Sequence, residues 1–160
     1  MITRRSLLLA LSGAAIGAAL PAFARTGDFA VGAIRVDASA LGPQGWGGNA
    51  GRIAQALEAE LAGRLAPLRR SGAPTLRVTV GSLRLGSGAG GMTGGGGGGD
   101  DSIDSMVELV SGGRVLFSRR ILVQQPDSSG GAWYNPEADN NRIAKLIEDT
   151  ARWTQRYLGA

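Results

Sequence analysis

Three segments with alternating apolar residues, joined by two glycine-containing connections, constrain the fold of this chain more than any other feature. They span residues 75–85, 101–110 and 114–125. A long glycine-rich stretch at 86–100 joins the first two, and Ser111-Gly112-Gly113 joins the last two. Alternation with a period of two is typical of β-strands with one buried face. The sequence therefore predicts three consecutive strands, each antiparallel to the next.

The register of the second hairpin follows from keeping its apolar residues on one face. A two-residue loop, Gly112-Gly113, would place Leu109 opposite Leu116 and would divide the apolar residues between both faces. A three-residue loop, Ser111-Gly112-Gly113, keeps them together, and we expect this register. Arg119 interrupts the apolar face, and we expect it at the sheet margin. The expected cross-strand pairs are Leu109–Val115, Val107–Phe117, Ile103–Ile121, Asp104–Arg120 and Met106–Ser118.

The composition excludes several kinds of chemistry. The 160 residues include no cysteine and no histidine. Disulfides, thiolate ligands, Ser-His-Asp and Cys-His catalysis and the usual zinc sites are therefore excluded. We expect no metal and no cofactor. At this length, even after removal of the amino-terminal export signal described below, we expect one domain. It should bury roughly two-thirds of the surface of its unfolded chain.

The positive charge of the chain is small once the leader is removed. The formal net charge is +4, but Arg4 and Arg5 belong to the leader, which leaves about +2 for the mature chain. Lys145 is the only lysine, so the basic character comes from arginine. A basic balance of this size is typical of a solvated surface, and we expect no nucleic-acid partner.

Residues 1–24 form an export signal peptide. A charged start, an apolar run over 7–20 and the small-x-small sequence Ala22-Phe23-Ala24 follow one another in the order of a cleaved leader. The string Thr3-Arg4-Arg5-Ser6-Leu7-Leu8 resembles the twin-arginine export signal. The resemblance implies export through the twin-arginine machinery, with the general secretory route as the alternative. The mature chain, 25–160, is expected to be soluble in the periplasm without a membrane span or a lipidated cysteine.

The first strand and the loop after it precede the predicted hairpins. Residues 28–37 alternate, with a slip near Gly32-Ala33 that predicts a bulge. Small residues dominate 38–48, which predicts a loop carrying Trp46. The first helix is predicted at 49–65, with Asn49 as its N-cap.

A second helix is predicted after a glycine-serine loop at 126–134, which ends in Trp133 and Tyr134. Asn135-Pro136-Glu137 is a strong helix start, with Asn135 as the N-cap. The apolar stripe that follows predicts a helix packed on the core. We expect its members to be buried: Ile143, Leu146, Ile147, Thr150, Trp153, Tyr157 and Leu158.

The glycine-rich stretch at 86–100 contains a Gly-x-Gly-x-x-Gly pattern from Gly86 to Gly91. A dinucleotide site would require a helix next, but Met92, Thr93 and six glycines follow. We therefore expect a flexible, disordered linker. Before it, Gly81 lies where the alternation changes parity, which predicts a bulge in that strand.

The element order predicts an α+β two-layer sandwich: a mixed four-stranded sheet, β-α-β-β-β-α, with both helices on one face. The first, second and fourth strands should run one way and the third the other. The loops at 38–48, 86–100 and 126–134 then leave one edge of the sheet, where both helices begin. A binding site is expected at this loop edge. Its candidate residues are Trp46, Asn49, Trp133, Tyr134 and Asn135.

This element order resembles small periplasmic envelope domains: lipopolysaccharide-assembly lipoproteins, auxiliary lipoproteins of transporters and the amino-terminal domain of TolB. The resemblance implies a non-enzymatic accessory role with an envelope protein partner. Two alternatives remain open. Aromatic residues at the loop edge could bind a small ligand or glycan, or two carboxylates could form a hydrolase. Glu137 and Asp139 fit first-turn helix acids better than a catalytic pair.

Overall fold

The computed structural model describes residues 29–86, 100–131 and 135–159. The predicted leader, most of the glycine-rich linker, Trp133 and Tyr134 lie outside these residues. The elements in chain order are β1 (Ile34–Asp37), η1 (Ser39–Gln44), α1 (Gly47–Arg64), η2 (Ala66–Leu68), β2 (Thr75–Arg84), β3 (Asp101–Ser111), β4 (Arg114–Gln125), η4 (Asp127–Gly130) and α2 (Ala138–Leu158).

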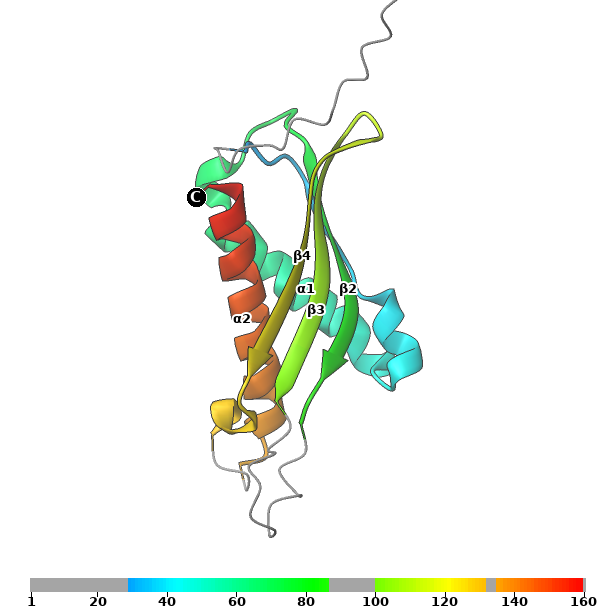
Figure 1. Cartoon of the computed structure of the whole chain (residues 1–160), viewed down its shortest axis with the longest axis vertical. Coiled ribbons are helices and arrows are strands. Elements are labelled where there is room, and N and C mark those ends of the chain that lie inside the picture. The colour runs from blue at the N-terminus through cyan, green and yellow to red at the C-terminus, as the bar shows by residue number, and fades with distance from the viewer. Residues whose placement is uncertain (1–28, 87–99, 132–134, 160) are drawn as a thin grey trace, which may run out of the picture.

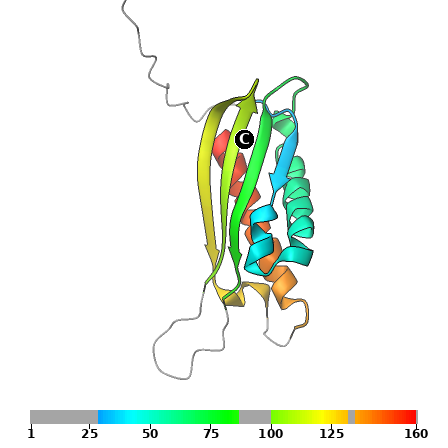
Figure 2. The same cartoon turned by 90° about the vertical axis from the view of Figure 1, so that its right-hand side faces the viewer.

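The four strands form one sheet in the order β1-β2-β3-β4. β1 runs parallel to β2, and the two following pairs are antiparallel, so the strand directions predicted from the sequence are confirmed. Both helices cover the same face: in Figure 2 the strands lie in front and the helices behind them. The predicted α+β two-layer sandwich is therefore the observed fold. The order of the strands, which the sequence left open, is the order of the chain.

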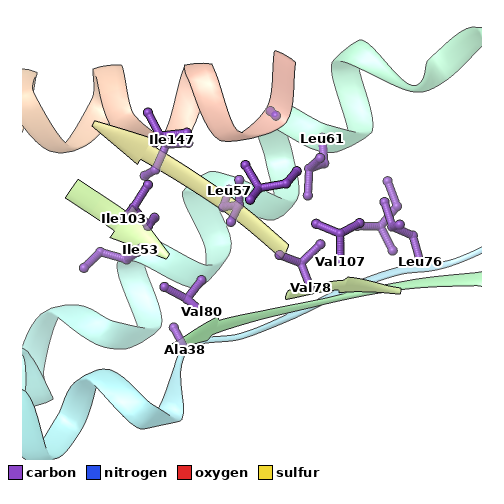
Figure 3. Packing of buried hydrophobic residues seen from close by; sticks show 14 of the residues in the cluster. Ala38, Ile53, Leu57, Leu61, Leu76, Val78, Val80, Ile103, Val107 and Ile147 are labelled. Carbon is purple, nitrogen blue, oxygen red and sulfur yellow. The ribbon is translucent and has the colours of Figure 1, made fainter. Parts of the chain in front are cut away.

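The core lies between the sheet and the helices. β2 contributes Leu76, Val78 and Val80 from one face, and α1 contributes a buried stripe at four-residue spacing. Figure 3 shows Ile53, Leu57 and Leu61 of that stripe gathered with Ile147 of α2 over the strand residues. The β2–β3 register shifts between Val80 and Ser82, so the predicted bulge at Gly81 is confirmed.

The predicted register of the β3–β4 hairpin is wrong. Its turn has two residues, Gly112 and Gly113, with φ angles of 54° and 78°. Val110 pairs with Val115 and Leu109 pairs with Phe117, which leaves Leu116 as an extra residue in β4. This bulge restores the apolar face that a two-residue turn alone would divide. Beyond it, the expected pairs are displaced by two residues and become Val107–Arg119, Met106–Arg120, Asp104–Leu122 and Ile103–Val123.

β1 is shorter than predicted because the chain makes a close backbone approach at Gly32. The Gly32 amide donates to the Pro74 carbonyl at 2.7 Å. A β-carbon at this glycine would lie 2.2 Å from the carbonyl oxygen of Ala73. Val31, one residue earlier, is fully buried and forms a separate parallel bridge with Arg69. The predicted bulge is thus a break between this bridge and the strand.

Both helices start at residues other than the predicted ones. α1 begins at Gly47 with Trp46 in the N-cap position, so Asn49 lies inside the first turn. The segment before it, predicted as loop, contains η1. α2 begins at Ala138 with Glu137 in the N-cap position. Asn135 is therefore not the N-cap of α2.

The apolar side of α2 differs from the predicted stripe at three positions, since Ile143 and Tyr157 are half-buried and Trp153 is exposed. Leu146, Thr150 and Leu158 are fully buried as expected. The Thr150 hydroxyl donates to the Leu146 carbonyl at 2.8 Å, which satisfies this buried polar group inside the helix. Trp153, however, is 37% exposed, so its assignment to the core was wrong.

Candidate functional site

Trp46 is a structural anchor of the turn into α1. Its indole Nε1 donates to the Leu83 carbonyl at 3.0 Å, and its half-buried ring packs against the core. Gln44 in the same turn donates to the Gly81 carbonyl at 2.8 Å. These two hydrogen bonds hold η1 and the start of α1 against β2. The side chain of Trp46 therefore has mainly a structural role.

Asn49 and Asn135 both form local hydrogen bonds. Oδ1 of Asn49 accepts from Nη2 of Arg52, one turn later on α1. Oδ1 of Asn135 accepts from the Glu137 amide at 2.9 Å, which makes an Asx turn ahead of α2. The other two candidates, Trp133 and Tyr134, lie outside the described residues, and a binding role for the set stays a prediction.

The starts of α1 and α2 meet, as the strand directions predict, across a narrow groove. Both helices begin toward the end of the sheet where β2 and β4 end (Figure 1). The groove has a volume of about 210 Å³. Ile53 and Ile147 contribute apolar walls, and Asn49, Arg52 and Asn140 add polar groups. Asn49 is the one predicted site residue in it. The volume is below the usual range for small-molecule pockets, roughly 300–1,000 Å³.

A larger hollow of about 540 Å³ lies where the chain turns into β2. Gly32, Arg69 and Arg70 are among its lining residues. The Arg70 guanidinium donates to the carbonyls of Pro67 and Arg69 at 2.9 and 2.7 Å. Because the guanidinium is bound to its own loop, this hollow is a weaker candidate for ligand recognition.

The sheet face opposite the helices is covered by no described element. Asp104 and Arg120 form a bidentate pair on it, with nitrogen–oxygen distances of 2.8 and 2.7 Å. These hydrogen bonds from Arg120 hold the pKa of the Asp104 carboxyl below its usual value. Met106 and Leu122 lie beside the pair and are 39% and 55% exposed. Contiguous exposed apolar side chains rimmed by polar residues are typical of contact surfaces.

Hydrogen-bonding and ion-pair partners occupy the buried carboxylates of the described residues. Asp101 is bound by Arg142 and by the Gly86 amide, the latter at 2.9 Å. One oxygen of Asp149 accepts from Gln125, and the other makes no hydrogen bond within the described residues but lies in ion-pair contact with Arg152. The described carboxyls with a shifted pKa are Asp37, Asp104 and Glu148, and each is lowered by hydrogen bonds. A two-carboxylate glycosidase needs an acid with a raised pKa, so these groups do not suit that role.

Residues 29–86, 100–131 and 135–159 contain no group of three or more acidic, histidine or cysteine side chains placed to hold a metal ion. Among the helices of the same residues, none is both long and apolar enough to cross a membrane.

Comparison with known proteins gives distant likenesses. No family model matches the sequence, and no curated protein matches it. Similar solved structures include a lipoprotein candidate from Caulobacter crescentus CB15, with a TM-score of 0.44 and 19% identity over 68% of this chain and 81% of that chain. A PelC dodecamer from Paraburkholderia phytofirmans has a TM-score of 0.40 and 14% identity over 77% of this chain and 86% of that chain. A PelC variant from the same organism has a TM-score of 0.39 and 15% identity, with the same coverage. All three TM-scores are below 0.5, so these likenesses carry no argument about this chain.

Proposed function

We propose that this chain is a non-enzymatic accessory protein of the bacterial cell envelope that is exported by its leader and acts by binding another envelope protein. One observation carries the binding role. The exposed large apolar side chains of the described residues all belong to β3, β4 and α2, and none belongs to β1, β2 or α1. They are Met106, Val115, Leu116, Leu122 and Trp153.

The restriction of these residues to three neighbouring elements supports a contact surface. Single apolar residues scattered over a surface are normal, whereas a concentration on adjacent elements marks an interaction site. The non-enzymatic role is supported by the chemistry of the chain. It has no histidine or cysteine, and the buried acids Asp101 and Asp149 both have cationic partners.

The experiment follows the tagged full chain in its native bacterium. We expect a shortened, leader-free form in the periplasm, running on a native gel as a complex larger than the chain alone. Leu122→Glu should dissolve the complex, because it places a charge in the contact, whereas Ala59→Glu on exposed α1 should not. A full-length chain retained in the cytoplasm or membrane would refute the export role. A complex that survives Leu122→Glu would refute the contact surface.

The twin-arginine route is a finer part of this proposal. Changing Arg4 and Arg5 to lysine should stop export through the twin-arginine machinery and cause the precursor to accumulate. Unchanged export would assign the leader to the general secretory route instead.

The groove between α1 and α2 favours a second candidate function, binding of a small ligand. Its lining combines the polar residues Asn49, Arg52 and Asn140 with apolar ones. Ala144→Phe would fill the groove from α2. If the groove is a ligand site, this variant should abolish the chemical-shift changes that a fragment library produces at Asn49 and Asn140. Shift changes that persist in the filled variant would exclude the groove.

A further inference from the structure

β4 is a long sheet edge whose outer backbone is free among the described residues. It is the last strand in the sheet order and pairs only with β3. It spans 12 residues without proline, and Figure 2 shows it at the left margin of the sheet. The opposite edge, β1, has only 4 residues. Unpaired backbone groups along such an edge are a template for another strand.

A row of stacked side chains connects this edge to α2. The guanidinium of Arg119 lies over the ring of Tyr157, with Cζ 4.7 Å from the centroid. Tyr157 stacks on Trp153 at 5.8 Å between centroids, and the guanidinium of Arg156 lies 5.2 Å from the Trp153 centroid. We call these four residues the arginine–aromatic row. The rings hold both guanidinium groups in place, which lowers the entropy lost when either binds an anion.

Two of the three arginines of β4 have no carboxylate within ion-pair distance among the described residues. β4 contains Arg114, Arg119 and Arg120 and no acidic residue. Among the described residues, Arg120 has Asp104 as its partner, but neither Arg119 nor Arg156 has a carboxylate within ion-pair distance. A second copy of β4 would bring arginines against arginines, which disfavours self-pairing. The complementary partner is acidic.

The two sides of β4 differ in what they offer a neighbouring strand. Arg119 faces the helices, since it contacts Tyr157 and pairs with the buried Val107. Leu122 pairs with Asp104 and is exposed on the open side of the sheet. Because side chains alternate along a strand, an added strand would present alternate residues to these two sides.

We propose that β4 binds an acidic, extended segment of a partner polypeptide as a fifth strand. Carboxylates at alternate positions of that segment bind Arg119 and Arg156, and apolar residues between them pack beside Leu122. The inference rests on the proposed function as an interaction protein and names the chemistry of its partner. A polypeptide fits better than an acidic glycan, because only a polypeptide can pair with the backbone edge.

The test is a binding titration of the mature chain with an acetylated peptide of about seven residues, a usual strand length, alternating glutamate and valine. Arg119→Gln together with Arg156→Gln should weaken binding about tenfold. The matched pair Arg35→Gln and Arg84→Gln removes the same charge from exposed residues of β1 and β2 and should change affinity less than about twofold. Equal losses in the two double variants would overturn the specific role of the arginine–aromatic row.

Peptide N-methylation tests the strand pairing on unaltered protein. Methylating the alternate amides on one edge of the peptide should abolish binding, while methylating the other edge should leave it, because an added strand pairs through one edge only. Binding that survives both patterns, or polygalacturonate that binds as tightly as the peptide, would overturn the fifth strand. The titration does not depend on cellular location. If the peptide fails to bind but the complex that depends on Leu122 still forms in the cell, the fifth strand is refuted and the proposed function is not.

Discussion

Arg142 on α2 binds the fully buried carboxylate of Asp101 at the start of β3, with Nε donating to Oδ2 at 2.7 Å. A second nitrogen of the same guanidinium contacts the other carboxylate oxygen and the Gly86 carbonyl just beyond β2. The hydrogen bonds to Asp101 raise the pKa of Arg142 above its usual value. One side chain thus ties a helix to the ends of two adjacent strands.

Removing Arg142 should therefore destabilise the protein strongly. Arg142→Gln leaves the Asp101 carboxylate buried without its cation, and we expect the free energy of unfolding to fall by about 3–5 kcal/mol. Arg142→Gln combined with Asp101→Asn should lose less than the single variant. Urea denaturation measures both, with exposed Arg52→Gln as the control. An additive loss in the double variant would show that the two side chains act independently.

Replacing Trp46 should destabilise the protein, because its side chain is bound to β2 and packs against the core. Trp46→Ala removes core packing and the bond to the Leu83 carbonyl, so we expect a loss of about 2–3 kcal/mol. Trp46→Phe keeps most of the packing and should lose about 1 kcal/mol. Trp153→Ala, at an exposed site, is the matched control. A smaller loss for Trp46→Ala than for Trp153→Ala would contradict the anchoring role.

The turn between β3 and β4 predicts that one glycine can be replaced by asparagine and that the other cannot be replaced by a β-branched residue. Both glycines have positive φ, as in a type I′ turn, where asparagine is tolerated first and glycine is preferred second. Gly112→Asn should leave the thermal midpoint nearly unchanged, whereas Gly113→Val should destabilise by about 1–2 kcal/mol. If both substitutions left the thermal midpoint unchanged, the result would contradict the two-residue turn. It would favour the three-residue loop expected from the sequence.

The Asp104–Arg120 pair should contribute to acid sensitivity. The lowered pKa of Asp104 means that the folded state favours the ionised carboxylate. Its contribution is therefore present above the unfolded pKa, near 3.8, and is lost as the pH falls through the lower folded value. The thermal midpoint of Asp104→Asn should be below that of the parent at pH 6, and the difference should shrink toward pH 2. A difference that does not change with pH would exclude this pair as a cause.

Much of the fold could be predicted because alternation and helical spacing report the buried side of each element. Strand directions followed from hairpins and crossovers, and the bulge at Gly81 followed from a change of parity. The register of the last hairpin could not be predicted in the same way. The extra residue in β4 is Leu116. Because Leu116 is apolar like its neighbours Val115 and Phe117, the alternation of the sequence does not reveal the bulge.

The candidate site was harder to predict because single residues depend on tertiary contacts. Trp46 has glycine on its C-terminal side and reads as a loop residue, yet Leu83, distant in sequence, accepts its hydrogen bond. Trp153 sits one residue, roughly 100° of helix rotation, from the buried Thr154, at the margin of the stripe. The contact of Arg119 with Tyr157 depends on how α2 packs against β4, which the sequence does not fix.

The side of the molecule formed by β4 and α2 should bind the partner. Site-specific photo-crosslinking in living cells measures this contact, with the reactive residue at Leu122 or Trp153 and, as controls, at Arg35 or Ala59. We expect Leu122 and Trp153 to crosslink to the same protein and the exposed controls to give no such product. Equal crosslinking from Arg35 and Ala59, or none from Leu122 and Trp153, would contradict the claim.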